Sequence, residues 1–210
     1  MPPATQYSPG IDVATGRIRD AVQILSPHFD ARPGAQAPEL IVVHGISLPP
    51  GDFGGPWIDR LFCGDLRPGA HPYFAEIASL RVSAHVLIPR HGLLRQYVPF
   101  GLRAWHAGVS EYRGRASCND FSIGIELEGT DDIAYTDDQY ASLAALIRAL
   151  VAAYDSLSAD RVVGHSDVAP GRKTDPGAAF DWARLRAAID SAATTSQGQA
   201  INGPAIKGQL

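Results

Sequence analysis

Apolar runs alternate along the chain with loops rich in glycine and proline. Residues 39–44 form such a run, with several β-branched side chains, and it ends in His44; residues 161–163 lead in the same way to His165. Runs of this kind are typical of buried central strands. We therefore expect two buried strands, each of which delivers a histidine to the loop that follows it.

Strict alternation of apolar and polar positions predicts another strand over residues 121–128. Ile123, Ile125 and Leu127 share one face, and Glu126 lies on the opposite face. From the pattern alone, Glu126 is by default a solvated strand residue. The sequence therefore predicts a strand whose apolar face meets the core and whose other face carries a carboxylate.

Two shorter runs, 84–89 and 93–98, flank a turn at 91–92 and predict a β-hairpin. Residues 1–38 are rich in proline, glycine and alanine, and only the piece near 21–25 resembles a strand. We expect the remainder of this region to wrap the surface.

The clearest helix begins at a capping box formed by Thr136 and Gln139, in which each side chain satisfies a free backbone amide of the other residue. Apolar residues at helical spacing then continue to Tyr154. Shorter helices are expected over 57–62, over 72–80 and from Asp181 onward. Because strands and helices interleave, we expect an α/β (or α+β) fold in which a sheet carries helices on both faces.

Composition narrows the classes of function. The 210 residues suit a single domain, and a net charge of −4 with a pI near 5.9 argues against a nucleic-acid partner or an anionic membrane surface. No signal peptide is visible, so a cytoplasmic location is expected. Reduced thiols are favoured over a single disulfide for Cys63 and Cys118. Small polar residues dominate 191–210, which predicts a disordered tail.

One loop combines the side chains of a metal site. After His165 the chain carries Lys173 and Asp175, two residues apart, whose side chains point the same way if the segment is extended. A catalytic zinc site takes three protein ligands, and His44 is the natural third ligand beside His165 and Asp175. These residues alone leave open the alternative that both histidines are structural or surface residues, since no HExxH-type spacing is present.

Five stretches of the chain, in this order, resemble the zinc N-acetylmuramoyl-L-alanine amidases. They are 44–51, 83–85, 105–108, 119–129 and 164–177. The resemblance covers roughly 22–190, leaves 1–21 as an N-terminal extension, and is closest to members that cleave 1,6-anhydro-N-acetylmuramoyl-L-alanine. It implies a single domain with a central mixed β-sheet and helices on both faces, similar to peptidoglycan recognition proteins.

The resemblance also implies roles for particular residues. It places zinc ligands on His44, His165 and Asp175, an acid/base on Glu126 and a stabilising cation on Lys173. A Zn²⁺ so held would lower the pKa of a bound water towards ~7. Glu126 would move the proton from this water to the leaving L-alanine nitrogen, and Lys173 would share the oxyanion.

Five further residues are candidates for substrate contacts: Gly45, His85, Trp105, His106 and Arg172. His85 and His106 would shape the sugar or peptide pocket or, equally, be hydrogen-bonded residues behind it. Trp105 would stack on the saccharide or belong to the core, and Arg172 would meet a peptide carboxylate or stay solvated. Gly45 departs from the asparagine common in the family, which removes one possible hydrogen bond to substrate.

The expected activity is hydrolysis of the amide between the lactyl group of (1,6-anhydro-)N-acetylmuramic acid and L-alanine, during peptidoglycan recycling. The expected partner is a small soluble muropeptide, and the expected protein is a monomer with no nucleic-acid or membrane partner. Two alternatives stay open. One is a peptidoglycan-binding module without activity; the other is an amidase of intact murein, which would need an export signal.

Overall fold

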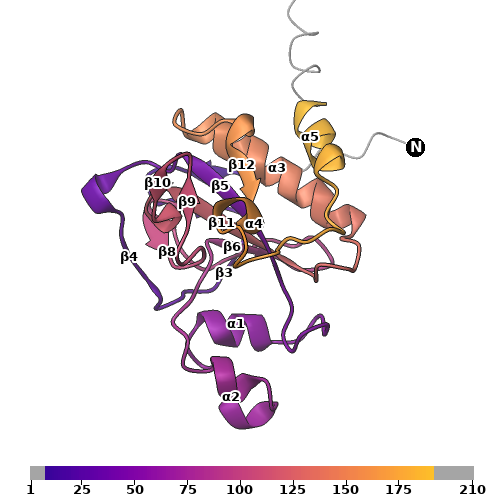
Figure 1. The fold of residues 1–210 in the computed structure, drawn as a ribbon. Helices are drawn as coiled ribbons and strands as arrows, with labels where there is room; N and C mark the ends of the chain where they lie inside the picture. The colour runs from indigo at the N-terminus through magenta and orange to yellow at the C-terminus, as the bar shows by residue number, and fades with distance from the viewer. Residues whose placement is uncertain (1–7, 192–210) are drawn as a thin grey trace, which may run out of the picture.

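A six-stranded mixed β-sheet forms the centre of the computed structural model, which describes residues 8–191 (Figure 1). The strand order is β12 (Val162–Gly164), β5 (Leu40–Ile46), β11 (Ser122–Glu128), β6 (Val86–Ile88), β7 (Arg95–Gln96) and β3 (Val22–Gln23). The first four strands run parallel, β7 is antiparallel to β6, and β3 is parallel to β7. The predicted α/β class and mixed sheet are confirmed.

Three two-stranded sheets surround this centre. They pair β1 (Ile11–Asp12) with β2 (Arg17–Ile18), β4 (Phe29–Ala31) with β8 (Leu102–Ala104), and β9 (Glu111–Tyr112) with β10 (Arg115–Ala116). The N-terminal region thus holds more strand than predicted, because strands of two or three residues are too short for a pattern to show. Ile18 is fully buried in the main core, so the described part of 1–21 packs onto the domain.

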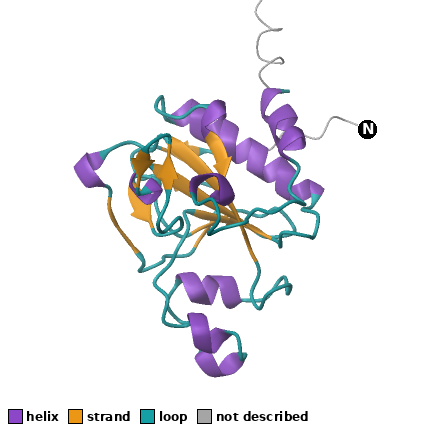
Figure 2. Cartoon of the chain, viewed as in Figure 1, coloured by secondary structure: helices purple, strands orange, loops and turns teal. Residues whose placement is uncertain are grey.

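Helices cover both faces of the central sheet (Figures 1 and 2). On one face lie α3 (Asp137–Ala153) and α5 (Trp182–Asp190); on the other lie α1 (Trp57–Phe62), α2 (Phe74–Ile77) and α4 (His165–Val168). Short 3-10 helices span Pro33–Ala35, Pro68–Ala70, Cys118–Asp120 and Ala159–Arg161. The helix predicted over 57–62 is confirmed, the one over 72–80 is shorter than predicted, and α4 was not predicted.

The predicted capping box at the start of α3 is present. The backbone amide of Gln139 donates to the Thr136 hydroxyl, and the Thr136 amide donates to the Gln139 side chain. The Gln139 amide group also donates to the carbonyls of Ile88 and Glu128, at the ends of β6 and β11. The cap therefore ties the first turn of α3 to the edge of the sheet where those strands end.

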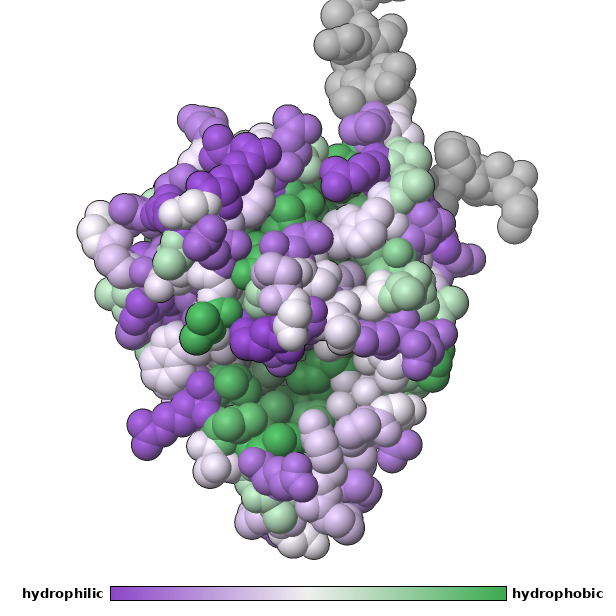
Figure 3. All heavy atoms as spheres, viewed as in Figure 1, coloured by the Kyte–Doolittle hydropathy of each residue, from purple (hydrophilic) through white to green (hydrophobic). Residues whose placement is uncertain are grey.

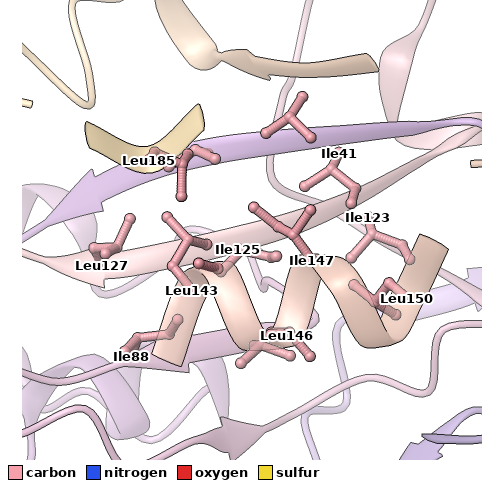
Figure 4. Packing of buried hydrophobic residues seen from close by; sticks show 14 of the residues in the cluster. Ile41, Ile88, Ile123, Ile125, Leu127, Leu143, Leu146, Ile147, Leu150 and Leu185 are labelled. Atoms are coloured by element: carbon pink, nitrogen blue, oxygen red, sulfur yellow. The ribbon is translucent and has the colours of Figure 1, made fainter. Parts of the chain in front are cut away.

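Apolar side chains of the sheet and of α3 form the main core (Figure 4). The predicted alternation in β11 is confirmed, since Ile123, Ile125 and Leu127 all point into this core. Each fully buried side chain of this size stabilises the fold by about 1.5–3 kcal/mol. Members labelled in Figure 4 include Ile41, Ile88, Leu143, Leu146, Ile147, Leu150 and Leu185.

The opposite face of the sheet is also covered, by a second core that joins α1 and α2 to β6, to β8 and to the residues directly after β7. For this reason the polar face of β11 is buried, and Glu126 is not the solvated residue that the alternation suggests by default. The thiols of Cys63 and Cys118 are both free, as predicted. No helix within 8–191 has the length and apolar character needed to cross a bilayer.

Candidate metal centre and active site

Three parallel strands deliver His44, Glu126 and His165 to one edge of the sheet. In the register of β5 and β11, His44 lies directly beside Glu126, and both point away from α3. Gly164 of β12 pairs with Val43 of β5, so His165 follows one step further along. The carboxyl ends of parallel strands meet at the same edge, which is why residues far apart in sequence meet here.

His44, His165 and Asp175 converge on one point, with one ligand atom from each within 4.8 Å of the others. His44 Nδ1 lies 2.9 Å from His165 Nδ1 and 3.2 Å from Asp175 Oδ2. His165 Nδ1 lies 3.0 Å from the same carboxylate oxygen, Asp175 Oδ2. Tetrahedral zinc bonds of about 2.0–2.1 Å would separate two ligands by roughly 3.3 Å. The spacing therefore suits three ligands of one small cation.

The neighbours of His165 show that its Nδ1 faces the other two residues as a lone pair. His165 Nε2 lies 3.1 Å from the backbone carbonyl of Ala107, which can only accept, so the neutral ring carries its proton on Nε2. Its Nδ1 lone pair then points at the Asp175 carboxylate, which also only accepts when ionised. A cation between these atoms removes that repulsion, so the donor set fits a divalent metal such as Zn²⁺.

His106 contacts the other histidine of the cluster, His44. His44 Nε2 lies 2.8 Å from His106 Nδ1, and His106 Nε2 lies 3.1 Å from the Ser122 hydroxyl. If His44 keeps its Nδ1 lone pair for a metal, Nε2–H donates to His106 and the His106 Nε2–H donates to Ser122. Gly124 makes room for the His106 ring in this series of hydrogen bonds, because a Cβ at position 124 would collide with that ring.

Burial keeps the imidazoles of His44 and His106 neutral, and the neutral form is the one in which a histidine can bind a metal. Burial lowers the pKa of His44 to about 4, although a hydrogen bond with Asp175 opposes the shift. Burial likewise lowers the pKa of His106 well below its usual value, and His44 beside it adds to the effect. Protons therefore do not compete with a metal for His44 near neutral pH.

Glu126 is a buried carboxyl group at the floor of the cleft. Its Oε2 has no hydrogen-bond partner within 8–191. Burial raises its pKa well above the usual value, the Asp175 carboxylate adds to the rise, and the Lys173 ammonium opposes it. A buried polar atom without a partner is rare and is typical of groups that act on a ligand or water.

The cleft above these residues has a volume of about 640 Å³ and two unlike sides. On one side α1, α2 and the segment after α2 contribute apolar groups; on the other, polar groups come from residues 129–131 and 172–175. Figure 3 shows the apolar surface in this hollow between polar margins. The apolar lining includes Leu61, Phe62, Ile77, Leu80 and Val82.

Lys173 and Arg172 both line the cleft, but they differ in what they contact. Within residues 8–191 Lys173 makes no ion pair, so its ammonium is available to a ligand. The Arg172 guanidinium donates to the carbonyls of Ala107, at 2.6 Å, and Val109, at 2.7 Å. Arg172 therefore braces the loop whose Ala107 carbonyl fixes the His165 tautomer.

The remaining predicted residues lie in different places. Gly45, Trp105 and His106 line the cleft. Trp105 also donates from its indole nitrogen to Asp30, at 3.1 Å. His85 is fully buried behind the cleft, where its Nδ1 accepts from the Gly124 amide, so its position favours the structural alternative.

Two contributions to the site have no signal in the sequence pattern. The Ala107 carbonyl acts through the backbone, which any residue provides. Tyr135 is buried near the site, and its hydroxyl donates to the carbonyl of Pro176, next to Asp175. As an aromatic residue in a loop before a helix, it could not be told from an ordinary core residue.

Comparison with known proteins gives a consistent result. A family model described as N-acetylmuramoyl-L-alanine amidase matches residues 34–178. The 1,6-anhydro-N-acetylmuramyl-L-alanine amidase AmpD of Salmonella typhimurium strain SL1344 is 63% identical over 174 residues, 83% of this chain and 92% of that protein.

Solved structures agree with the sequence comparison. The crystal structure of a selenomethionine AmpD derivative has a TM-score of 0.82 at 61% identity and covers 85% of this chain and 98% of its own. The amidase AmiD from E. coli, in complex with the substrate anhydro-N-acetylmuramic acid-L-Ala-D-gamma-Glu-L-Lys, has a TM-score of 0.53 at 25% identity, covering 85% and 75%. From the extent of these matches, the chain belongs to the N-acetylmuramoyl-L-alanine amidase family.

Proposed function

We propose that this amidase hydrolyses the bond between the lactyl group of 1,6-anhydro-N-acetylmuramic acid and L-alanine in small soluble muropeptides, as a step of peptidoglycan recycling. One observation carries the proposal: a metal-competent His44, His165 and Asp175 cluster lies beside a buried, unpartnered Glu126 carboxyl in an open cleft. The relatives named as 1,6-anhydro-muramyl amidases support this choice of substrate.

We further propose that His44, His165 and Asp175 hold one Zn²⁺. When bound, this ion supplies Lewis acidity and makes a water more acidic at neutral pH. The chain's own contribution is the geometry of its donors. The Ala107 carbonyl sets the tautomer of His165, and His106 can accept the Nε2 proton of His44, which leaves both Nδ1 lone pairs for the metal.

Glu126 is proposed to move the proton of the reaction. Its raised pKa makes the ionised carboxylate a stronger base, so its free Oε2 can accept a proton from a water and, once protonated, return it to the leaving L-alanine nitrogen. Lys173 is proposed to stabilise the negative charge that develops on the carbonyl oxygen. Both groups line the same cleft.

The two sides of the cleft support a division between the parts of the substrate. The apolar side, with Leu80 and Val82, suits the compact anhydro sugar, whose internal bridge replaces the C1 and C6 hydroxyl groups of ordinary N-acetylmuramic acid. The cationic side, at 172–175, suits the carboxylates of the peptide.

A cytoplasmic location and a monomeric state stay predictions from the sequence.

The test is to incubate the zinc-reconstituted protein with anhydro-muropeptide and, separately, with intact sacculi, and to resolve the products by mass spectrometry. We expect free anhydro-muramic acid and peptide from the first and little release from the second. Release from sacculi alone would favour an amidase of intact murein, and release from neither would leave a binding module.

The variant Glu126→Gln should retain zinc and lose at least about a hundredfold in kcat, because general acid–base groups contribute roughly 10²–10⁴-fold. Glu128→Gln is the matched control. Glu128 is a second buried carboxyl on the same face of β11, but it accepts from the amides of Gly54 and Arg90 instead of lying free. Near-normal turnover of Glu126→Gln would remove the proposed acid/base role.

A further inference from the structure

The loop that carries Lys173 and Asp175 is held mostly by its own backbone. The Lys173 amide donates to the Ala169 carbonyl, the Ser166 amide donates to the Asp175 carbonyl, and the Gly177 amide donates to the Thr174 carbonyl, each at 3.0 Å. Bonds of this kind set the path of the loop, but they join it only to itself and to α4.

Tyr135 joins this loop to the rest of the site. Its hydroxyl donates to the Pro176 carbonyl over 2.9 Å in a buried position. Across residues 8–191 it is the only hydrogen bond from a side chain to the backbone of residues 173–177. Pro176 directly follows Asp175, so this bond acts one residue away from the carboxylate ligand.

The Tyr135 ring is wedged between the ends of two strands. A Cβ at Gly45, next to His44 in β5, would collide with the Tyr135 hydroxyl. A Cβ at Gly129, directly after β11, would collide with its ring. Tyr135 therefore contacts the three segments that supply His44, Glu126 and Asp175, yet it does not line the cleft.

We propose that Tyr135 is a positioning residue that holds the Asp175 loop against the ends of β5 and β11 and so raises the metal affinity of the site. The inference rests on the proposed function only in that a divalent metal occupies His44, His165 and Asp175. A loop held in place before the metal arrives loses less freedom on binding, and partners behind the ligands typically change metal affinity 10–100-fold.

The chain contains a matched control. Tyr140 is equally buried, contacts the same Phe180 ring, and accepts a hydrogen bond from the Asp181 amide at 2.6 Å. Its hydroxyl therefore also satisfies one backbone group, but at the start of α5 instead of in the ligand loop. Tyr140→Phe reproduces the loss of a buried hydroxyl without touching the Asp175 loop.

The experiment compares wild type, Tyr135→Phe and Tyr140→Phe by zinc competition against a chelator of known affinity, with kcat and KM measured at saturating zinc. Phenylalanine keeps the ring, and the Tm of the zinc-free proteins reports any general loss of stability. We expect zinc affinity to fall about tenfold in Tyr135→Phe, with a lower kcat and an unchanged KM. Tyr140→Phe should stay within about twofold of wild type in all three quantities, because its hydroxyl lies outside the ligand loop.

A zinc affinity of Tyr135→Phe equal to that of the wild type would overturn the inference and leave the proposed function intact. An equal fall in both variants would also overturn it, because the effect would then follow from general destabilisation. A wild-type protein that binds no zinc would instead refute the metal site itself, so the two failures are distinguishable.

Discussion

At the scale of single residues, the site depends on which nitrogen of each histidine carries the proton. The Ala107 carbonyl decides this for His165, and His106 can accept the Nε2 proton of His44 when the Nδ1 of His44 faces a metal. Each partner contacts the ring nitrogen that faces away from the cluster of His44, His165 and Asp175. Their contribution is to aim a lone pair, which is why a substitution behind the ligands should change metal binding without changing the ligands.

We predict that His106→Ala lowers zinc affinity about tenfold or more, because His44 loses the acceptor that orients its ring. Zinc competition against a chelator measures the effect. His28→Ala is the control, since His28 hydrogen-bonds the Val82 carbonyl and contacts none of the three ligand residues. Wild-type zinc affinity in His106→Ala would contradict the assigned tautomer of His44.

At the scale of elements, the site exists because β12, β5 and β11 are parallel neighbours in register. The pairing of His44 with Glu126 places a proposed metal ligand and the proposed proton carrier side by side on one face. The same face must admit the His106 ring, and Gly124 in the middle of β11 provides the space. In this strand, which is buried on both faces, position 124 is a glycine, and the space that a side chain would fill is occupied by the His106 imidazole.

We predict that Gly124→Ala destabilises the fold by about 1–3 kcal/mol, the usual cost of overpacking, and weakens zinc binding by displacing His106. Urea unfolding and zinc competition measure the two effects. Gly101→Ala is the matched control, because a Cβ there would meet no atom within 4 Å and should change neither quantity. A loss of stability without a loss of zinc affinity would show that His106 keeps its place.

At the scale of the whole molecule, the fold keeps several histidines neutral in its interior. Burial lowers the pKa of His85 to about 3 from a usual 6.5, and the Arg32 guanidinium beside it adds to the effect. The unfolded chain binds a proton at this residue below about pH 6.5, whereas the folded chain does so only near pH 3. Acid therefore favours the unfolded state over this window.

We predict that the free energy of unfolding of the zinc-free protein falls as the pH is lowered from about 6.5 towards 3, with His85 contributing about 1.4 kcal/mol per pH unit. Urea unfolding at a series of pH values measures the slope. His85→Asn should reduce that slope by about one proton. An unchanged slope in this variant would mean that His85 does not titrate between the two states.

Much of the architecture was predictable because it depends on local patterns. Alternation located β11, the apolar runs located β5 and β12, and the capping box located α3. The two- and three-residue strands of the N-terminal region and the four-residue α4 escaped prediction. Elements that short owe their conformation to partners far away in the sequence, so their own residues carry no periodic signal.

By itself, the sequence determined the side chains of the site: two histidines after buried strands, a carboxylate and a lysine in one loop, and a glutamate on the polar face of a strand. Only the tertiary structure decided that β12, β5 and β11 lie side by side, that Glu126 is buried, that His106 contacts His44, and that Tyr135 hydrogen-bonds the residue after Asp175. The physical reason is that side-chain chemistry is a local property. Burial, tautomer and ligand spacing arise from contacts between segments tens of residues apart.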